Sequence, residues 1–84
     1  MPTARPLQLG FIGGSAQSAV GPVHFAACRL DGLFDVAAGC FSRDSATNAA
    51  TAARYGVAPE RTYDDRVTML AAEKGRLDAL VVLT

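Results

Sequence analysis

The sequence predicts an α/β fold in which helices flank a parallel, doubly wound sheet. Three observations support this prediction. The chain opens with an apolar run that ends in a glycine-rich turn, later apolar runs alternate with segments of helical periodicity, and the loops between them are short. Such alternation is typical of parallel sheets with right-handed crossovers. The 84 residues suffice for one small domain at most, and half of them are apolar, so they can form a core.

The first strand is expected at residues 7–12, directly before a turn that contains Gly13 and Gly14. These glycines can adopt the positive φ values that a tight strand-to-helix turn needs. Gly21 would let the next helix approach the strand closely, and Pro22 suits the first helical position because no N–H is needed there. The turn therefore predicts a helix N-terminus whose unpaired N–H groups attract a phosphate.

The spacing of this turn departs from the dinucleotide fingerprint G-x-G-x-x-G. Gly13 fits the first position, Ser15 stands at the second, and the third falls at Gly21, three residues late. For the glycines alone, an ordinary strand-to-helix connection is the competing interpretation.

The remaining elements follow in alternation, which gives the order β-α-β-α-β-α-β with four strands. The expected helices and strands cover residues 22–30, 34–41, 46–55, 61–63, 66–74 and 79–83. In the first helix, the apolar residues at helical spacing should face the sheet: Val23, Ala26, Ala27 and Leu30.

Short polar residues and glycines mark the helix ends. Asp44 or Ser45 should cap the second helix, and Asp64 or Asp65 the third. Capping is also the main interpretation of the Asp64–Asp65 pair. The glycines expected to end the three helices are Gly32, after Asp31, then Gly56 and Gly75.

Four strands are fewer than the roughly six of a complete doubly wound dinucleotide-binding fold. The last strand would also be an uncovered edge. We therefore expect a lead-in at residues 1–6 and, at residues 7–84, the N-terminal portion of a truncated dinucleotide-binding domain. In isolation such a chain should fold poorly or associate.

Composition excludes several classes of partner. Eight basic residues balance eight acidic ones, so no nucleic-acid or membrane partner is expected from net charge. The apolar run at residues 79–83 is too short to span a bilayer, and the N-terminus lacks a signal-peptide pattern. Cys28 and Cys40 lie in apolar stretches, which favours a reducing, cytoplasmic location.

The end of the second strand carries the cofactor signal. An acidic residue about 20 positions past the glycine turn normally binds the ribose 2′-OH of NAD. Ser42 occupies that place, with Arg43 beside it. A hydroxyl and a guanidinium suit a phosphate, so this pattern favours NADP, with NAD still possible. A solvated turn with an exposed arginine is the alternative, and Asp44 could weaken the preference.

Several of these segments resemble the start of the Gfo/Idh/MocA oxidoreductases. The resemblance covers nearly the whole chain from Leu7, and its nearest likeness is to a subgroup with a lengthened turn before Gly-Pro-Val-His. The segments that carry it are residues 9–14, Gly21-Pro22-Val23-His24, residues 36–44, residues 61–65, Met69-Leu70 and residues 77–84.

The resemblance implies the N-terminal NAD(P)-binding, Rossmann-type domain of a dehydrogenase that acts on a hydroxyl or keto group of a sugar- or cyclitol-like substrate. A second α/β domain, often dimer-forming, would follow, so the full-length protein should be a homo-oligomer. The catalytic lysine, in a Glu-Lys-Pro motif, and a histidine would lie past the last strand. Glu73-Lys74 is not that motif, because Gly75 follows. No catalytic residue is therefore predicted here.

The predicted contacts to the cofactor come from the glycine turn and the strand ends. These residues are Gly13, Gly14, Ser15, Ala16, Gln17, Gly21, Ser42, Arg43, Leu83 and Thr84. His24 and Cys28 stand four apart on one helix, but two ligands do not make a metal site. Two other hypotheses remain: a dinucleotide-binding regulatory module without turnover, and a structural fragment that binds nothing.

Overall fold

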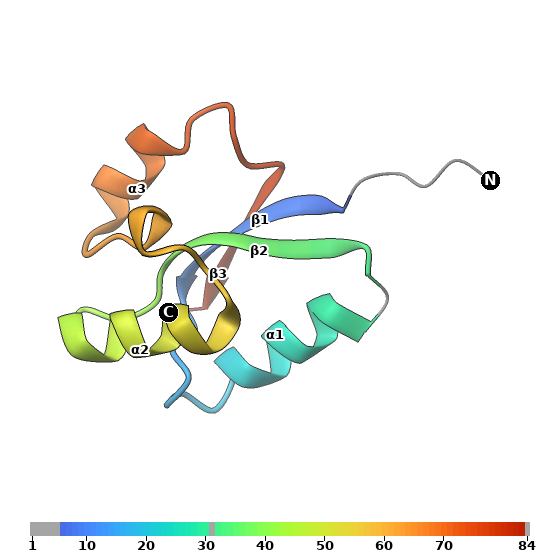
Figure 1. The fold of residues 1–84 in the computed structure, drawn as a ribbon, viewed down its shortest axis with the longest axis horizontal. Helices are drawn as coiled ribbons and strands as arrows, with labels where there is room; N and C mark the ends of the chain where they lie inside the picture. The colour runs from blue at the N-terminus through green and yellow to red at the C-terminus, as the bar shows by residue number, and fades with distance from the viewer. Residues whose placement is uncertain (1–5, 31, 84) are drawn as a thin grey trace.

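The computed structural model describes residues 6–30 and 32–83 and contains a three-stranded parallel sheet with helices on both faces (Figure 1). The strands are β1 (Leu7–Gly13), β2 (Phe34–Cys40) and β3 (Ala79–Leu83), in the order β2-β1-β3. The helices are α1 (Gly21–Leu30), α2 (Ser45–Tyr55) and α3 (Arg66–Ala72), with a short 3₁₀ helix, η1 (Pro59–Arg61). The predicted α/β class and parallel sheet are confirmed. The lead-in at residues 1–5, Asp31 and Thr84 lie outside the described residues.

Two apolar clusters cover the two faces of the sheet. The larger cluster lies on the side of α1 and α2, and its buried residues are Phe11, Val36, Phe41, Ala52, Tyr55 and Val57. The smaller cluster lies on the side of α3, which Figure 1 shows on the opposite face, and consists of Ile12, Ala38 and Met69. Adjacent residues of β1, Phe11 and Ile12, thus face different clusters, as expected for a strand covered on both faces. In β2 a register shift lies between Val36 and Ala38, which belong to different clusters although they are two residues apart.

The strand predicted at residues 61–63 is wrong. Residues 59–61 form η1, with Pro59 at its start, and Thr62 alone pairs with β2, through an isolated parallel bridge to Gly39. The N–H of Tyr63 donates to the Gly39 carbonyl at 2.8 Å. Pro59 favours a tight turn and leaves too few residues before α3 for a ladder. The described residues therefore form three strands where four were expected, and Thr62 lies beside β2.

The buried face of α1 also differs from the prediction. The residues expected to face the sheet are all exposed: Val23, Ala26, Ala27 and Leu30. Phe25 packs instead against the larger cluster and stacks on Tyr55, with ring centroids 4.3 Å apart. An aromatic ring buries more apolar area than valine or alanine. Gly21, the first residue of α1, is also buried. The spacing of Val23, Ala26, Ala27 and Leu30 therefore did not indicate the buried face of this helix.

The helix ends follow their local signals closely. The Asp44 carboxylate accepts a hydrogen bond from the Thr47 N–H at 2.9 Å and caps α2, which ends at Gly56 with a φ of 75°. The Asp65 carboxylate caps α3 by accepting from the Thr68 N–H at 2.9 Å. Of the two alternatives at each cap, the structure selects Asp44 and Asp65. The third helix ends at Ala72, two residues before the predicted end.

The early end of α3 places Glu73 inside the molecule. Glu73 is 2% exposed and accepts hydrogen bonds from Arg61 Nε at 3.1 Å and from the Tyr63 hydroxyl at 2.6 Å. The Arg61 guanidinium lowers the pKa of Glu73, against the opposing effect of burial. The ion pair between Arg61 and Glu73 connects η1 to the end of α3. It lies in the region where a strand was predicted and does not form.

We expect Glu73 to contribute to the acid sensitivity of the fold. Its pKa is lower in the folded state, so its stabilising effect is present above the unfolded pKa of about 4.3 and is lost as pH falls through the folded pKa. Glu73→Gln should cost about 1.5–3 kcal/mol at pH 7 and should flatten the decline in stability between about pH 5 and pH 3. Urea unfolding across this range measures both effects.

The control is Glu60→Gln, which alters an exposed carboxylate in η1. It should leave both the stability and its pH dependence unchanged. If the free energy of unfolding falls equally between pH 5 and pH 3 in wild type and Glu73→Gln, Glu73 does not contribute to the acid sensitivity of the fold.

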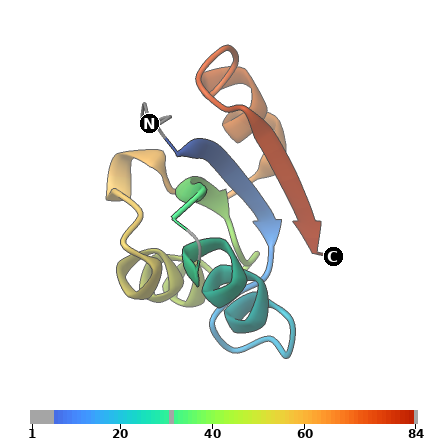
Figure 2. The same ribbon diagram turned by 90° about the vertical axis from the view of Figure 1, so that its right-hand side faces the viewer.

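Among the described residues, β3 pairs only with β1, so its outer edge is uncovered (Figure 2). Leu80 and Val82 on this strand are 42% and 61% exposed, and α1 adds Val23 and Leu30, which are 66% and 83% exposed. An apolar edge strand offers a template for pairing with another chain. We therefore expect the 84-residue chain to self-associate at micromolar concentrations.

Val82→Lys should shift this association toward monomer, because a charge on the edge opposes strand pairing. Val67→Lys, at a site on α3 that is 72% exposed, is the matched control and should leave association unchanged. Sedimentation velocity measures both variants. A wild-type chain that stays monomeric at high concentration would contradict this prediction.

Candidate functional site

The turn between β1 and α1 has the backbone that its glycines predict. Gly13 and Gly14 have φ values of 83° and 75°, which L side chains rarely adopt. Gly21 carries a different constraint, because a side chain there would collide with the carbonyl oxygens of Gly14 and Ser15. The close approach is therefore between the start of α1 and the turn itself, rather than between α1 and the strand.

Ser18 closes the turn from within. Its hydroxyl donates to the Ser15 carbonyl at 2.8 Å and accepts from the Gly21 N–H at 2.9 Å. The Ala16 N–H donates to Thr51 Oγ1 at 3.0 Å. In the described part of the turn, five N–H groups have no protein acceptor: those of Gly14, Ser15, Gln17, Ala19 and Val20. These groups are the donors that remain for an anion, whereas Gly21 and Ala16 serve the turn through shape and anchoring.

Helix α2 holds both loops of the site with buried polar side chains that sequence analysis missed. Thr51 and Tyr55 are 0% and 3% exposed and bind the glycine turn, Tyr55 through a 3.0 Å bond from its hydroxyl to the Gly14 carbonyl. Asn48 accepts from the Phe41 N–H at 2.8 Å and donates to the Tyr63 carbonyl at 2.7 Å, which fixes the chain after β2. Polar residues at helical spacing in an alanine-rich helix were the available signal.

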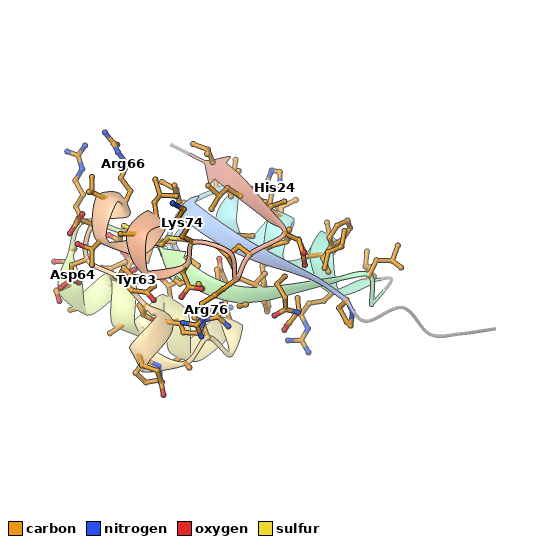
Figure 3. The ribbon with its side chains drawn as sticks, turned by 90° about the horizontal axis from the view of Figure 1, so that it is seen from above. His24, Tyr63, Asp64, Arg66, Lys74 and Arg76 are labelled. Atoms are coloured by element: carbon orange, nitrogen blue, oxygen red, sulfur yellow. The ribbon has the colours of Figure 1, made fainter. Side chains whose placement is uncertain are left out.

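A cavity of about 490 Å³ opens at the carboxyl ends of β1 and β2. Ligands bind in this region of doubly wound sheets. Its lining brings together the predicted residues Gly13, Ser42 and Arg43, and it adds Asp64, Asp65 and Arg66 from the start of α3. Figure 3 shows Asp64 and Arg66 at the same end of the molecule, with His24 well apart from them.

The other predicted residues lie outside the lining of this cavity. Ser15, Ala16, Gln17 and Gly21 belong to the adjoining turn. Leu83 lies against that turn, since its Cδ1 would be 2.7 Å from a Cβ placed on Gly14. Thr84 is not among the described residues.

The charges at the cavity are mixed, which the sequence did not indicate. Arg43 and Arg66 share the lining with Asp64 and Asp65. The Asp65 carboxylate is engaged by Thr68, whose hydroxyl donates to it at 2.6 Å. Burial and then these two carboxylates raise the pKa of the Cys40 thiol. Ser42 itself places no carboxylate at the expected ribose position, but Asp44 follows two residues later and Asp64 enters the cavity lining from another segment.

Among residues 6–30 and 32–83, no group of three or more His, Cys, Asp or Glu side chains is placed to hold a metal ion. Cys28 and Cys40 are both free thiols. Within the same ranges, no helix has the length and apolar character needed to cross a membrane.

No family model matches the sequence. An uncharacterized oxidoreductase of Bacillus subtilis, YfiI, is 33% identical over 82 residues, which are 96% of this chain and 21% of that protein. An inositol dehydrogenase homologue from Azotobacter vinelandii, solved in complex with NAD+, superposes with a TM-score of 0.88 at 30% identity, over 96% of this chain and 22% of the other.

An oxidoreductase from Sinorhizobium meliloti gives a TM-score of 0.84 at 31% identity, over 96% of this chain and 23% of the other. The chain thus spans about a fifth of the length of the relatives that it matches. The parallel sheet, the glycine turn and these matches agree with the resemblance found in the sequence. The chain is thus similar over 96% of its length to these oxidoreductases.

Proposed function

We propose that this chain is the cofactor-binding part of a longer NADP(H)-dependent oxidoreductase. The observation that carries the proposal is the cavity at the carboxyl ends of β1 and β2, whose lining brings Ser42 and Arg43 together with Gly13 at the start of the glycine turn. Several N–H groups of that turn have no protein acceptor. The relative from A. vinelandii is complexed with NAD+, and a second structure of it with NADH and myo-inositol, which supports a nicotinamide dinucleotide and a sugar- or cyclitol-like substrate.

In this proposal, different residues of the chain bind different parts of the cofactor. The N–H groups of Ser15 and Gln17 would bind the pyrophosphate, since N–H groups at the start of a helix favour anions. Ser42 and Arg43 would hold the adenosine ribose. When bound, the nicotinamide supplies hydride transfer to or from a carbon that bears a hydroxyl or keto group. The substrate site and the catalytic residues would lie in other parts of the longer protein.

The preference for NADP rests on Arg43 and its surroundings. A guanidinium can bind a 2′-phosphate through two parallel hydrogen bonds, and Arg66 adds a second positive charge to the same cavity. Asp64 and Asp65, in the same lining, oppose this preference by repulsion. Ser42 adds no carboxylate, and its hydroxyl accepts from the Asp44 N–H at 3.1 Å. We therefore propose NADP as the favoured cofactor and NAD as a weaker ligand.

Titration of the full-length protein with NADPH and NADH tests the proposal. NADPH should bind about tenfold to a hundredfold more tightly, because a charge-assisted contact contributes about 1.5–3 kcal/mol. Adenosine 2′-monophosphate should compete with NADPH, whereas adenosine should compete poorly. Equal binding of NADH and NADPH would remove the NADP preference. Binding of neither would contradict the proposed function.

A further inference from the structure

The ring of Tyr55 is held on several sides. It stacks on Phe25 with an interplanar angle of 12°, and it makes edge contacts with Phe11 and Phe41 at centroid distances of 6.2 and 5.4 Å. Its hydroxyl therefore has a fixed position, 3.0 Å from the Gly14 carbonyl, which is 41 residues away in sequence. Burial raises the pKa of Tyr55, so the phenol remains a donor at neutral pH.

The bond from Tyr55 constrains a donor on the far side of the same peptide group. The Gly14 carbonyl and the Ser15 N–H belong to one planar trans peptide, so they point in opposite directions. Holding the carbonyl toward Tyr55 therefore turns the Ser15 N–H away from α2. This N–H is among those that the described turn leaves without a protein acceptor.

The next peptide is fixed in the same manner. The Ala16 N–H donates to Thr51 Oγ1 at 3.0 Å, while the Ser15 carbonyl, on the opposite side of that peptide, accepts from the Ser18 N–H at 3.0 Å. Both peptide groups that flank Ser15 are thus anchored, and the anchors on α2 are the side chains of Tyr55 and Thr51. Neither side chain lines the cavity at the strand ends.

We infer that Tyr55 is a positioning residue that aims the Ser15 N–H at the pyrophosphate of the dinucleotide, with Thr51 holding the neighbouring peptide. The inference rests on the proposed function and names residues that would not touch the cofactor. The alternative is that the Tyr55 hydroxyl only satisfies a buried polar group. The two accounts differ in which ligand loses affinity when the hydroxyl is removed.

The test compares NADPH with adenosine 2′-monophosphate, which carries the 2′-phosphate but no pyrophosphate. Tyr55→Phe in the full-length protein keeps the ring and removes the bond to Gly14. It should weaken NADPH about 3- to 10-fold, the range expected for one misaimed hydrogen bond. Adenosine 2′-monophosphate should bind as to wild type. Thr51→Val should act in the same way, and Thr51→Ser, which keeps the acceptor, should restore NADPH binding.

Tyr63→Phe is the matched control, because Tyr63 is the other tyrosine of the chain and donates to Glu73 away from the turn. It should leave both ligands unchanged, and thermal melts of all variants register any general loss of stability. Equal weakening of both ligands by Tyr55→Phe, or the same NADPH loss in Tyr63→Phe, would overturn the inference. If wild type binds adenosine 2′-monophosphate and NADPH with no loss in Tyr55→Phe and Thr51→Val, the inference fails while the proposed function stands. If wild type binds no NADPH, both fail.

Discussion

Gly21→Val is expected to abolish measurable dinucleotide binding, with a loss of at least about a hundredfold, or about 2.7 kcal/mol. A Cβ at this position meets the carbonyl oxygens of Gly14 and Ser15. These are backbone atoms, so the contact is relieved only if the turn moves away from α1. That movement would misplace the Ser15 N–H and would break the Ser18 bond to the Gly21 N–H. Overpacking should also lower the stability of the fold by about 1–3 kcal/mol.

Calorimetric titration with NADPH, combined with thermal melts, measures both effects in the full-length protein. Ala19→Val is the matched control, because it adds a bulkier side chain at an exposed position two residues earlier. It should bind NADPH as wild type does. A folded Gly21→Val protein with unchanged affinity would remove the glycine turn from the site.

Arg43→Ala should erase most of the preference for NADPH, through a loss of about tenfold to a hundredfold in NADPH affinity with little change for NADH. Arg43 is an exposed residue of the cavity lining, and its guanidinium would contact only the 2′-phosphate. Ser42→Asp should reverse the preference, because a carboxylate there would repel that phosphate and accept from the ribose hydroxyls of NADH.

Titration of both reduced cofactors against each variant measures the change in preference. Arg54→Ala, on the exposed side of α2 and outside the cavity lining, is the control and should behave as wild type. Asp64→Asn should strengthen NADPH binding, because it removes a negative charge from the lining. If Arg43→Ala leaves NADPH affinity intact, Arg43 points to solvent and the turn after β2 plays no part in cofactor choice.

Local signals in the sequence predicted most of the secondary structure. β1, β2 and β3 lie within one residue of their expected bounds, because apolar runs between glycines and polar turns define them. The positive φ values of Gly13, Gly14, Gly32 and Gly56 and the caps at Asp44 and Asp65 also follow from single residue types. Each of these features depends on the chemistry of a few neighbouring residues.

The features that sequence analysis missed depend on contacts between distant segments. The rotation of α1 about its axis is set by the stacking of Phe25 on Tyr55, which lies in another helix. Glu73 replaces strand pairing with an ion pair that no local pattern indicates. Asp64 joins Ser42 at one cavity only because the chain returns beside β2. Sequence analysis therefore predicted the parts of the candidate site that follow β1 and β2. It missed the contributions of α2 and of the residues at the start of α3.

The central claim is that the glycine turn and the end of β2 bind a nicotinamide dinucleotide. Backbone amide chemical shifts of the ¹⁵N-labelled full-length protein, recorded as NADPH is added, test it most directly. The account predicts that the largest changes fall on Ser15, Gln17, Ser42 and Arg43, with the Ser15 and Gln17 resonances moving as their N–H groups gain an acceptor. Changes confined to the separate cavity between α3 and β3, at Leu70, Gly75 and Leu80, or no changes at all, would contradict it.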